Sequence, residues 1–107
     1  MEISTAEVKQ LFDAGAPFGL VDCRTDEERQ TAAIEPSQFI PMNQIQARIS
    51  EIEAYRDSQL VVYCHHGGRS LMVVEWLRGQ GFSQAQSMTG GIDEWSTLID
   101  PNITRYQ

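Results

Sequence analysis

One loop of the sequence combines the residue types that nucleophilic chemistry needs: Tyr63-Cys64-His65-His66-Gly67-Gly68-Arg69-Ser70. The two glycines allow the backbone to curl so that successive N–H groups point at one centre, which makes a nest for an anion. A helix that begins near Ser70 adds its positive end to the same place. A cysteine beside such a nest loses its proton more readily than a free thiol, and the thiolate is the nucleophilic form. The loop therefore predicts Cys64 as a nucleophile.

The distribution of charge along the chain also points to this loop. The 107 residues include 15 acidic and 8 basic ones, which gives a formal net charge of −7. Between Gln59 and Val74 there is no acidic residue, whereas Arg69 and both histidines of the chain lie there. An acidic chain lacks the basic face that nucleic acid or an anionic membrane surface requires, so neither is expected as a partner. A positive island in an acidic protein predicts a site for a small anion.

Strand and helix patterns alternate around the loop. Short apolar runs predict strands at residues 19–23, 39–40, 60–63 and 84–88. Helical spacing and capping signals predict helices at residues 4–15, 43–55, 70–80 and 92–98, and the acidic residues of 26–29 predict the start of a further short helix. This alternation predicts an α/β fold, an open and mostly parallel sheet with helices on both faces. Active sites of such sheets lie beyond the carboxyl ends of the strands, where Cys23 and Cys64 both stand.

Three segments, in this order, resemble the signatures of rhodanese-like domains. They are Leu20-Val21-Asp22-Cys23-Arg24 with Asp26-Glu27-Glu28, then Cys64 with its loop to Arg69-Ser70, then Thr89-Gly90-Gly91-Ile92-Asp93-Glu94-Trp95. Asp100-Pro101 and Arg105-Tyr106 are similar to the tail of a bacterial subset of single-domain members. The resemblance implies one rhodanese-like domain over residues 1–107, with a short C-terminal tail over residues 99–107. In two places the chain departs from the family: residues 32–37 lack the common Gly-His-Ile-Pro-Gly-Ala stretch, and Cys23 stands where valine is usual.

By this resemblance the protein is a sulfurtransferase. Cys64 is then the catalytic cysteine, which takes a sulfane sulfur from thiosulfate or another persulfide donor and passes it to a thiol or cyanide. The resemblance implies that the substrate is held by His65, His66, Gly67, Gly68, Arg69 and Ser70, whose backbone N–H groups surround the persulfide. We assign Arg69 to the anionic end of the donor because a guanidinium forks onto paired oxygens. The two histidines line the entrance, and the sequence does not choose between them as a proton relay.

Other titratable residues near the loop receive supporting roles. Asp22 and Arg24 flank the same end of the sheet and are expected to form an ion pair that supports the Cys64 loop. Cys23 is interpreted as a small buried hydrophobe, with a second, resolving thiol as the alternative. No metal is predicted, because the cysteines and histidines lack paired ligand spacing. No organic cofactor is implied.

Two alternative functions use the same loop. A cysteine phosphatase or arsenate reductase would place five residues between the cysteine and the arginine, whereas four separate Cys64 from Arg69. The other alternative is a persulfide-carrying or sensing module that acts on a protein partner. A protein sulfur donor or acceptor is therefore a partner that the sequence leaves open.

The sequence gives no sign of export or membrane insertion. Its longest aliphatic run, Leu60-Val61-Val62, is far too short to span a bilayer. The first residues lack the basic and apolar regions of a signal peptide. Two cysteines cannot build a disulfide framework. We therefore expect a cytoplasmic protein.

Overall fold

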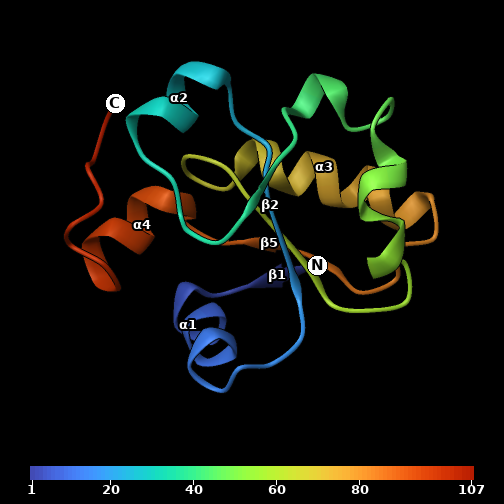
Figure 1. The fold of residues 1–107 in the computed structure, drawn as a ribbon, viewed down its shortest axis with the longest axis horizontal. Coiled ribbons are helices and arrows are strands. Elements are labelled where there is room, and N and C mark those ends of the chain that lie inside the picture. Colours follow the sequence, from blue (N-terminus) through green and yellow to red (C-terminus); the bar gives the residue numbers. More distant parts are fainter.

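A sheet of five parallel strands forms the centre of the computed structural model, which describes residues 1–107 (Figure 1). The strands are β1 (Glu2–Ile3), β2 (Gly19–Asp22), β3 (Gln38–Phe39), β4 (Leu60–Tyr63) and β5 (Ala85–Met88). Their order across the sheet is β1-β5-β4-β2-β3, and each neighbouring pair is parallel. The prediction of an open parallel sheet is confirmed.

Helices cover both faces of the sheet, as predicted (Figure 1). They are α1 (Thr5–Asp13), α2 (Asp26–Thr31), α3 (Gly68–Gly79) and α4 (Gly91–Leu98), together with the 3-10 helices η1 (Met42–Gln44) and η2 (Ile49–Tyr55). α1 and α4 pack on one face, whereas α3, η1 and η2 cover the other. None of the helices combines the length and the apolar character needed to cross a membrane.

The central strand β4 separates two layers of the core. Successive side chains of a strand point to opposite faces of the sheet. Val61 and Tyr63 pack with α1 and α4, and Val62 and Cys64 pack with α3. Burial on both faces explains why β4 is a continuous apolar run. The same alternation places Cys64 on the face covered by α3, the helix that follows it.

Two capping boxes fix the starts of α1 and α2. At α1, Ser4 Oγ accepts a hydrogen bond from Glu7 N at 3.1 Å, and Glu7 Oε1 accepts one from Ser4 N at 3.1 Å, as predicted. Thr25 and Glu28 make the same reciprocal pair at α2. Each box satisfies two backbone donors that would otherwise lack partners. The second box also fixes the Glu28 carboxylate at the carboxyl end of the sheet.

The prediction of an α-helix over residues 43–55 is wrong in helix type. This segment forms η1 and η2, two 3-10 helices separated by a break that ends at Arg48. In a 3-10 helix, side chains three residues apart lie above one another, and Arg48 pairs with Glu51 in this way. The apolar residues of this segment still face the core, because Ile45 and Ile52 are buried.

Two element boundaries also differ from the prediction. β1 was not predicted, and its residue Ile3 pairs with Met88 at the edge of β5. α3 begins at Gly68 rather than near Ser70. Its N-cap is Gly67, whose φ of 109° lies in the left-handed region that favours glycine. The turn at Gly67 carries the chain from Cys64 into α3 within four residues.

Candidate active site

Cys64 lies at the carboxyl end of β4 and begins the loop to α3. The residue is buried, with 1% of its surface exposed. Its sulfur accepts hydrogen bonds from the backbone N–H groups of Gly67, at 3.1 Å, and Ser70, at 3.4 Å. The thiol donates to Ser70 Oγ at 3.4 Å. The loop is therefore a curled backbone with the Cys64 sulfur near its centre.

The other backbone N–H groups of this loop have no hydrogen-bond acceptor within the protein. These are the N–H groups of His65, His66, Gly68 and Arg69. Successive unpaired N–H groups in one curled loop form a concave set of donors that is available to a ligand. Together with the positive end of α3, these donors form a site for an anion beside the Cys64 sulfur.

The first turn of α4 anchors the loop through its backbone. Ile92 N donates to Cys64 O at 2.9 Å, and Asp93 N donates to His65 O at 3.1 Å. Gly91, the first residue of α4, has a φ of 60°. A β-carbon at Gly91 would overlap the carbonyl groups of Cys64 and His65. Glycine is therefore required at this position by the close approach of α4 to the loop.

A pair of buried serines supports the loop on the side of β5. Ser70 Oγ and Ser87 Oγ lie 2.7 Å apart, and neither residue has more than 1% of its surface exposed. Ser70 Oγ also donates to Gly67 O at 3.2 Å. This network holds the hydroxyl of Ser70 next to the Cys64 sulfur.

Arg69, which the sequence assigns to the anionic end of the donor, is paired with a carboxylate from α2. Its two terminal nitrogens donate to the two carboxylate oxygens of Glu28 at 2.7 and 2.8 Å. This bidentate hydrogen bonding holds the pKa of Glu28 well below its usual range and raises the pKa of Arg69. Both groups are therefore charged at neutral pH.

The C-terminal tail reaches the site through Tyr106. The tail runs along α4 towards α2 (Figure 1). Tyr106 Oη donates to Glu28 Oε2 at 2.6 Å and accepts from Arg24 Nη1 at 2.9 Å. The Tyr106 ring stacks on His65, with centroids 4.0 Å apart and planes at 12°. Burial, and then the hydrogen bond to Glu28, raise the pKa of Tyr106, so its hydroxyl stays protonated as a donor.

The two histidines of the loop occupy different environments. The His66 side chain is 68% exposed, and its Nδ1 lies 3.9 Å from Asp93 Oδ2. The His65 ring lies between the rings of His66 and Tyr106, with centroid distances of 3.9 and 4.0 Å. Burial, and then the neighbouring His66, lower the pKa of His65. His65 is therefore mainly neutral at pH 7.

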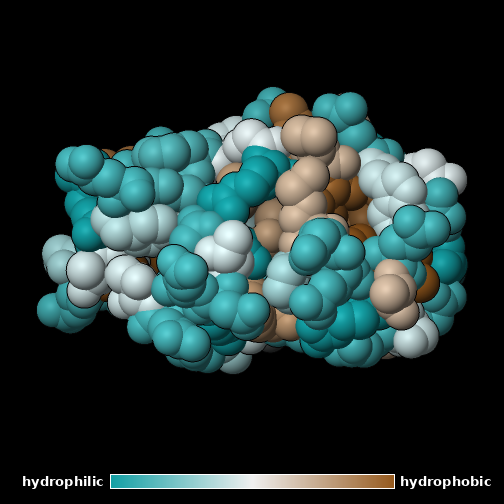
Figure 2. All heavy atoms as spheres, turned by 90° about the horizontal axis from the view of Figure 1, so that it is seen from above, coloured by the Kyte–Doolittle hydropathy of each residue, from teal (hydrophilic) through white to brown (hydrophobic).

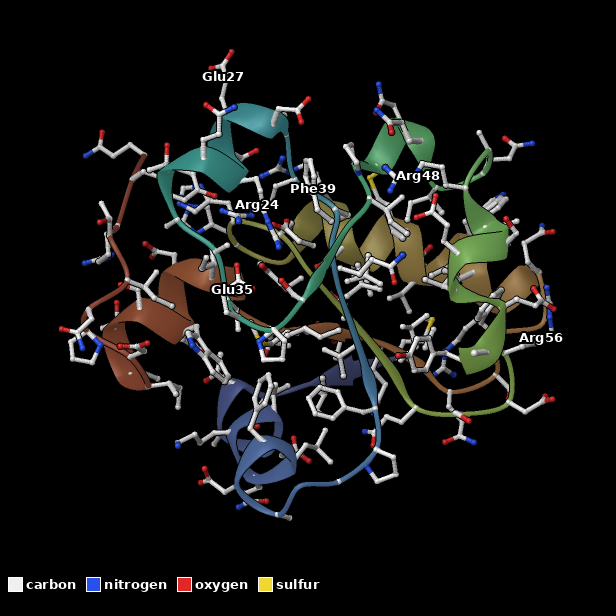
Figure 3. All side chains as sticks on the ribbon, viewed as in Figure 1. Arg24, Glu27, Glu35, Phe39, Arg48 and Arg56 are labelled. Atoms are coloured by element: carbon white, nitrogen blue, oxygen red, sulfur yellow. The ribbon has the colours of Figure 1, made fainter.

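Asp22 and Arg24 form a fully buried ion pair at the end of β2. Arg24 Nε and Nη2 donate to the two oxygens of Asp22 at 2.8 and 2.7 Å. Arg29 Nη1 donates to the same carboxylate at 3.2 Å. Arg24 lies beneath α2, where it also donates to Ala32 O at 2.6 Å (Figure 3). The pair thus ties the end of β2 to α2 and, through Tyr106, to the tail.

Cys23 is the neighbour of Cys64 across the sheet. The register pairs Asp22 with Tyr63, so the next residues on each strand stand side by side on the α3 face. Burial, and then the nearby Cys64, raise the pKa of the Cys23 thiol. A buried thiol that stays protonated is a poor nucleophile. These observations support a packing role for Cys23.

We expect Cys23→Ala to keep the capacity of Cys64 to accept sulfur. The substitution removes one buried sulfur atom and should lower the free energy of unfolding by about 1 kcal/mol. Urea unfolding measures the stability, and intact mass after treatment with a sulfur donor measures the loading. If the folded variant released the sulfur from Cys64 at a rate different from that of the wild type, Cys23 would instead have a resolving role.

An open cavity of about 600 Å³ lies where α2, η1 and the Cys64 loop meet. It is lined by Cys23, Arg24, Thr25, Asp26, Pro41, Met42, Asn43, Gln44 and Arg69. This volume falls within the range of small-molecule sites. Seen from above, after a 90° turn from Figure 1, the surface of the molecule is mostly hydrophilic, with a strip of hydrophobic residues near its middle (Figure 2).

The prediction of a positive island around Cys64 is wrong. No acidic residue lies nearby in the sequence, but the fold brings Glu28 to Arg69 and Asp93 to His66. Both carboxylates come from other segments of the chain, so the order of charges along the sequence cannot show them. The attraction of the loop for an anion therefore rests on its backbone N–H groups rather than on surplus positive side chains.

Sequence reasoning gave no role in the site to Glu28, Asp93, Ser87 or Tyr106. Glu28 and Asp93 stand inside the first and third signatures, and Tyr106 stands in the tail that resembles a bacterial subset. Their positions in these motifs were the available signal. Ser87 lies in a short predicted strand and had no signal of its own.

Comparison with known proteins agrees with this fold and loop. A family model described as a rhodanese-like domain matches residues 4–98. The chain therefore belongs to the rhodanese-like family. The crystal structure of a rhodanese-like domain protein from Staphylococcus aureus has a TM-score of 0.83 and 30% identity, and the match covers 100% of both chains. The human single-domain sulfurtransferase TSTD1, at 24% identity and a TM-score of 0.78, shares the fold over 91% of this chain and 96% of its own.

Longer relatives contain a region similar to this chain. The adenylyltransferase and sulfurtransferase MOCS3-1 of Zea mays is 35% identical over 97% of this chain and 23% of its own length. The probable adenylyltransferase/sulfurtransferase MoeZ of Mycobacterium tuberculosis is 29% identical over 97% of this chain and 26% of its own length. The chain thus spans about a quarter of the length of these curated relatives.

Proposed function

We propose that this chain is a sulfurtransferase that carries sulfur as a persulfide on Cys64. The Cys64 thiolate attacks the outer sulfur of thiosulfate or of another persulfide donor. A new S–S bond forms, the S–S bond of the donor breaks, and sulfite leaves when thiosulfate is the donor. A thiol or cyanide then attacks the outer sulfur and releases the Cys64 thiolate. The relatives named as sulfurtransferases support this class of reaction.

The observation that carries this proposal is the set of backbone donors around the Cys64 sulfur. The N–H groups of Gly67 and Ser70 already donate to Sγ. The four remaining N–H groups of the loop have no acceptor in the protein. A persulfide anion places its charge one atom beyond Sγ, and preformed unpaired donors are what stabilises such a charge.

The same loop makes phosphoryl transfer the weaker alternative. Four residues separate Cys64 from Arg69, one fewer than in the cysteine phosphatases that the loop resembles. In addition, both terminal nitrogens of Arg69 donate to Glu28 rather than facing an open phosphate site. Release of phosphate from an aryl phosphate, dependent on Cys64, would favour the phosphatase alternative.

Intact-mass measurement tests the proposed reaction. We expect the wild-type protein to gain the mass of one sulfur atom after treatment with thiosulfate or with an organic sulfane-sulfur donor. Cyanide should remove this sulfur as thiocyanate, and digestion should locate it on the peptide that contains Cys64. No gain with any donor, from a protein whose Cys64 still reacts with iodoacetamide, would contradict the proposal.

A further inference from the structure

The carboxylate of Glu28 occupies the position on Arg69 that an anionic donor would use. Both of its oxygens accept from the terminal nitrogens of Arg69, at 2.7 and 2.8 Å. The paired oxygens of a sulfonate would bind the guanidinium through the same two-pronged geometry. A donor that uses this edge of Arg69 must therefore displace Glu28.

Glu28 is held in this position by donors from three other groups. Thr25 N and Thr25 Oγ1 donate to Glu28 Oε1 at 3.2 and 3.1 Å, as parts of the cap of α2. Tyr106 Oη donates to Glu28 Oε2 at 2.6 Å. The Glu28 side chain is only 17% exposed. Displacement would break all of these hydrogen bonds, so Glu28 is a fixed part of the site rather than a mobile surface acid.

The Glu28–Arg69 pair also changes the charge that an approaching donor meets. Arg69 lies in the wall of the cavity between α2 and η1, and Asp26 of α2 lies in the same wall. Glu28 neutralises Arg69, and Asp22 neutralises Arg24. This wall therefore carries no net positive side-chain charge. A dianion gains less from such a surface than from a free guanidinium, whereas a donor with less charge loses little.

We propose that Glu28 is a specificity-determining residue that selects against dianionic sulfur donors and favours donors with at most one negative charge next to the transferred sulfur. This proposal rests on the proposed sulfur transfer and deepens it by naming the class of donor. Thiosulfate is the disfavoured donor. The favoured class is an organic sulfane-sulfur compound, in which a carbon group replaces one charged oxygen or the whole sulfonate.

Two donors that differ by one charge allow a direct comparison. With thiosulfate, the Cys64 thiolate takes the outer sulfur, the S–S bond of the donor breaks, and sulfite leaves with its two negative charges. With methanethiosulfonate, the same bond breaks and methanesulfinate leaves with one negative charge. Both reactions give the same Cys64 persulfide anion, so neither needs a further oxidant or reductant. The ratio of the two loading rates therefore reports on donor charge.

The decisive variant is Glu28→Gln, with Glu27→Gln as its matched control. The single amide oxygen of glutamine can still accept from Thr25, and its NH2 group can donate to Tyr106 Oη, but the side chain no longer neutralises Arg69. Glu27 undergoes the same change of charge on the same helix, and it is exposed and points away from the molecule (Figure 3). Thermal unfolding and circular dichroism establish that both variants keep the fold.

We expect Glu28→Gln to raise the loading rate with thiosulfate about tenfold and the rate with methanethiosulfonate about twofold or less. Glu27→Gln should change both rates by less than about twofold, because its charge is exposed and screened. The gain with thiosulfate should disappear in the double variant Glu28→Gln with Arg69→Ala. That dependence would show that the effect passes through Arg69.

If the ratio of the loading rates with thiosulfate and with methanethiosulfonate stayed at the wild-type value in folded Glu28→Gln, the role of Glu28 would be overturned, while the proposed sulfur transfer would stand. Loading of neither donor in wild type or in any variant would instead overturn the proposed function. A fall in the thiosulfate rate of folded Glu28→Gln would show that Glu28 supports the loop rather than excluding the dianion.

A measurement on the wild-type protein tests the same inference if Glu28→Gln does not fold. Raising the ionic strength from about 0.01 M to about 0.1 M shortens the Debye length from about 30 to about 10 Å. A free Arg69 would make thiosulfate loading slower at the higher salt, whereas a neutralised Arg69 in a protein of net charge −7 should leave it unchanged or make it faster. A steep fall with salt would contradict the proposal.

Discussion

Cys64→Ser is expected to abolish sulfur transfer, with a loss on the order of 10⁴-fold or more. A serine hydroxyl at neutral pH is a far weaker nucleophile than a thiolate, and no general base lies within hydrogen-bond distance of this position. The backbone donors of Gly67 and Ser70 would remain in place, but they would have no thiolate to stabilise. Turnover with thiosulfate and cyanide, and intact mass after donor treatment, measure the loss.

The same variant should keep its fold. Serine is close in size to cysteine, and its hydroxyl can accept from the same two N–H groups. The free energy of unfolding should therefore change by less than about 1.5 kcal/mol. Cys23→Ala is the matched control, because it alters the neighbouring buried thiol and leaves Cys64 in place. Substantial turnover by folded Cys64→Ser would contradict the mechanism, since no other thiol of the chain faces the backbone donors.

Gly91→Ala is expected to lower the free energy of unfolding by about 3 kcal/mol. An alanine at the φ of 60° found there costs about 1–2 kcal/mol, and overlap of its β-carbon with neighbouring atoms adds about 1–3 kcal/mol. The atoms that must move are the carbonyl groups of Cys64 and His65, which belong to the loop itself. The midpoint of thermal unfolding should fall by about 10 °C or more, and sulfur loading should fall with it.

Gly79→Ala is the control for this prediction. Gly79 ends α3, and a β-carbon there meets no atom within 4 Å. Alanine is the better helix former, so this variant should be unchanged or up to about 1 kcal/mol more stable. Equal stability of the Gly91 and Gly79 variants would contradict the close contact between Gly91 of α4 and the carbonyl groups of the loop.

The order of the elements followed from local patterns in the sequence. The apolar run of β4 and the capping box of Ser4 and Glu7 were both predicted, because each depends on residues close together in the chain. Local patterns failed where two outcomes use the same spacing. The isoleucines at 45, 49 and 52 have the spacing of an α-helix, but Ile45 lies between η1 and η2, and Ile49 and Ile52 lie three residues apart within η2.

In the candidate site, too, contacts between residues close in the sequence were predictable, whereas contacts between distant residues were not. Cys64, its glycines and the start of α3 lie within a few residues of one another, so the sequence by itself determined the curled loop and the sulfur at its centre. The tertiary structure alone decided what Arg69 does. Its partner Glu28 lies 41 residues away, and Tyr106, which holds Glu28, lies 78 residues from it. Backbone curvature is set by neighbours in the chain, whereas a charge is neutralised by whatever the fold brings within a few ångströms of it.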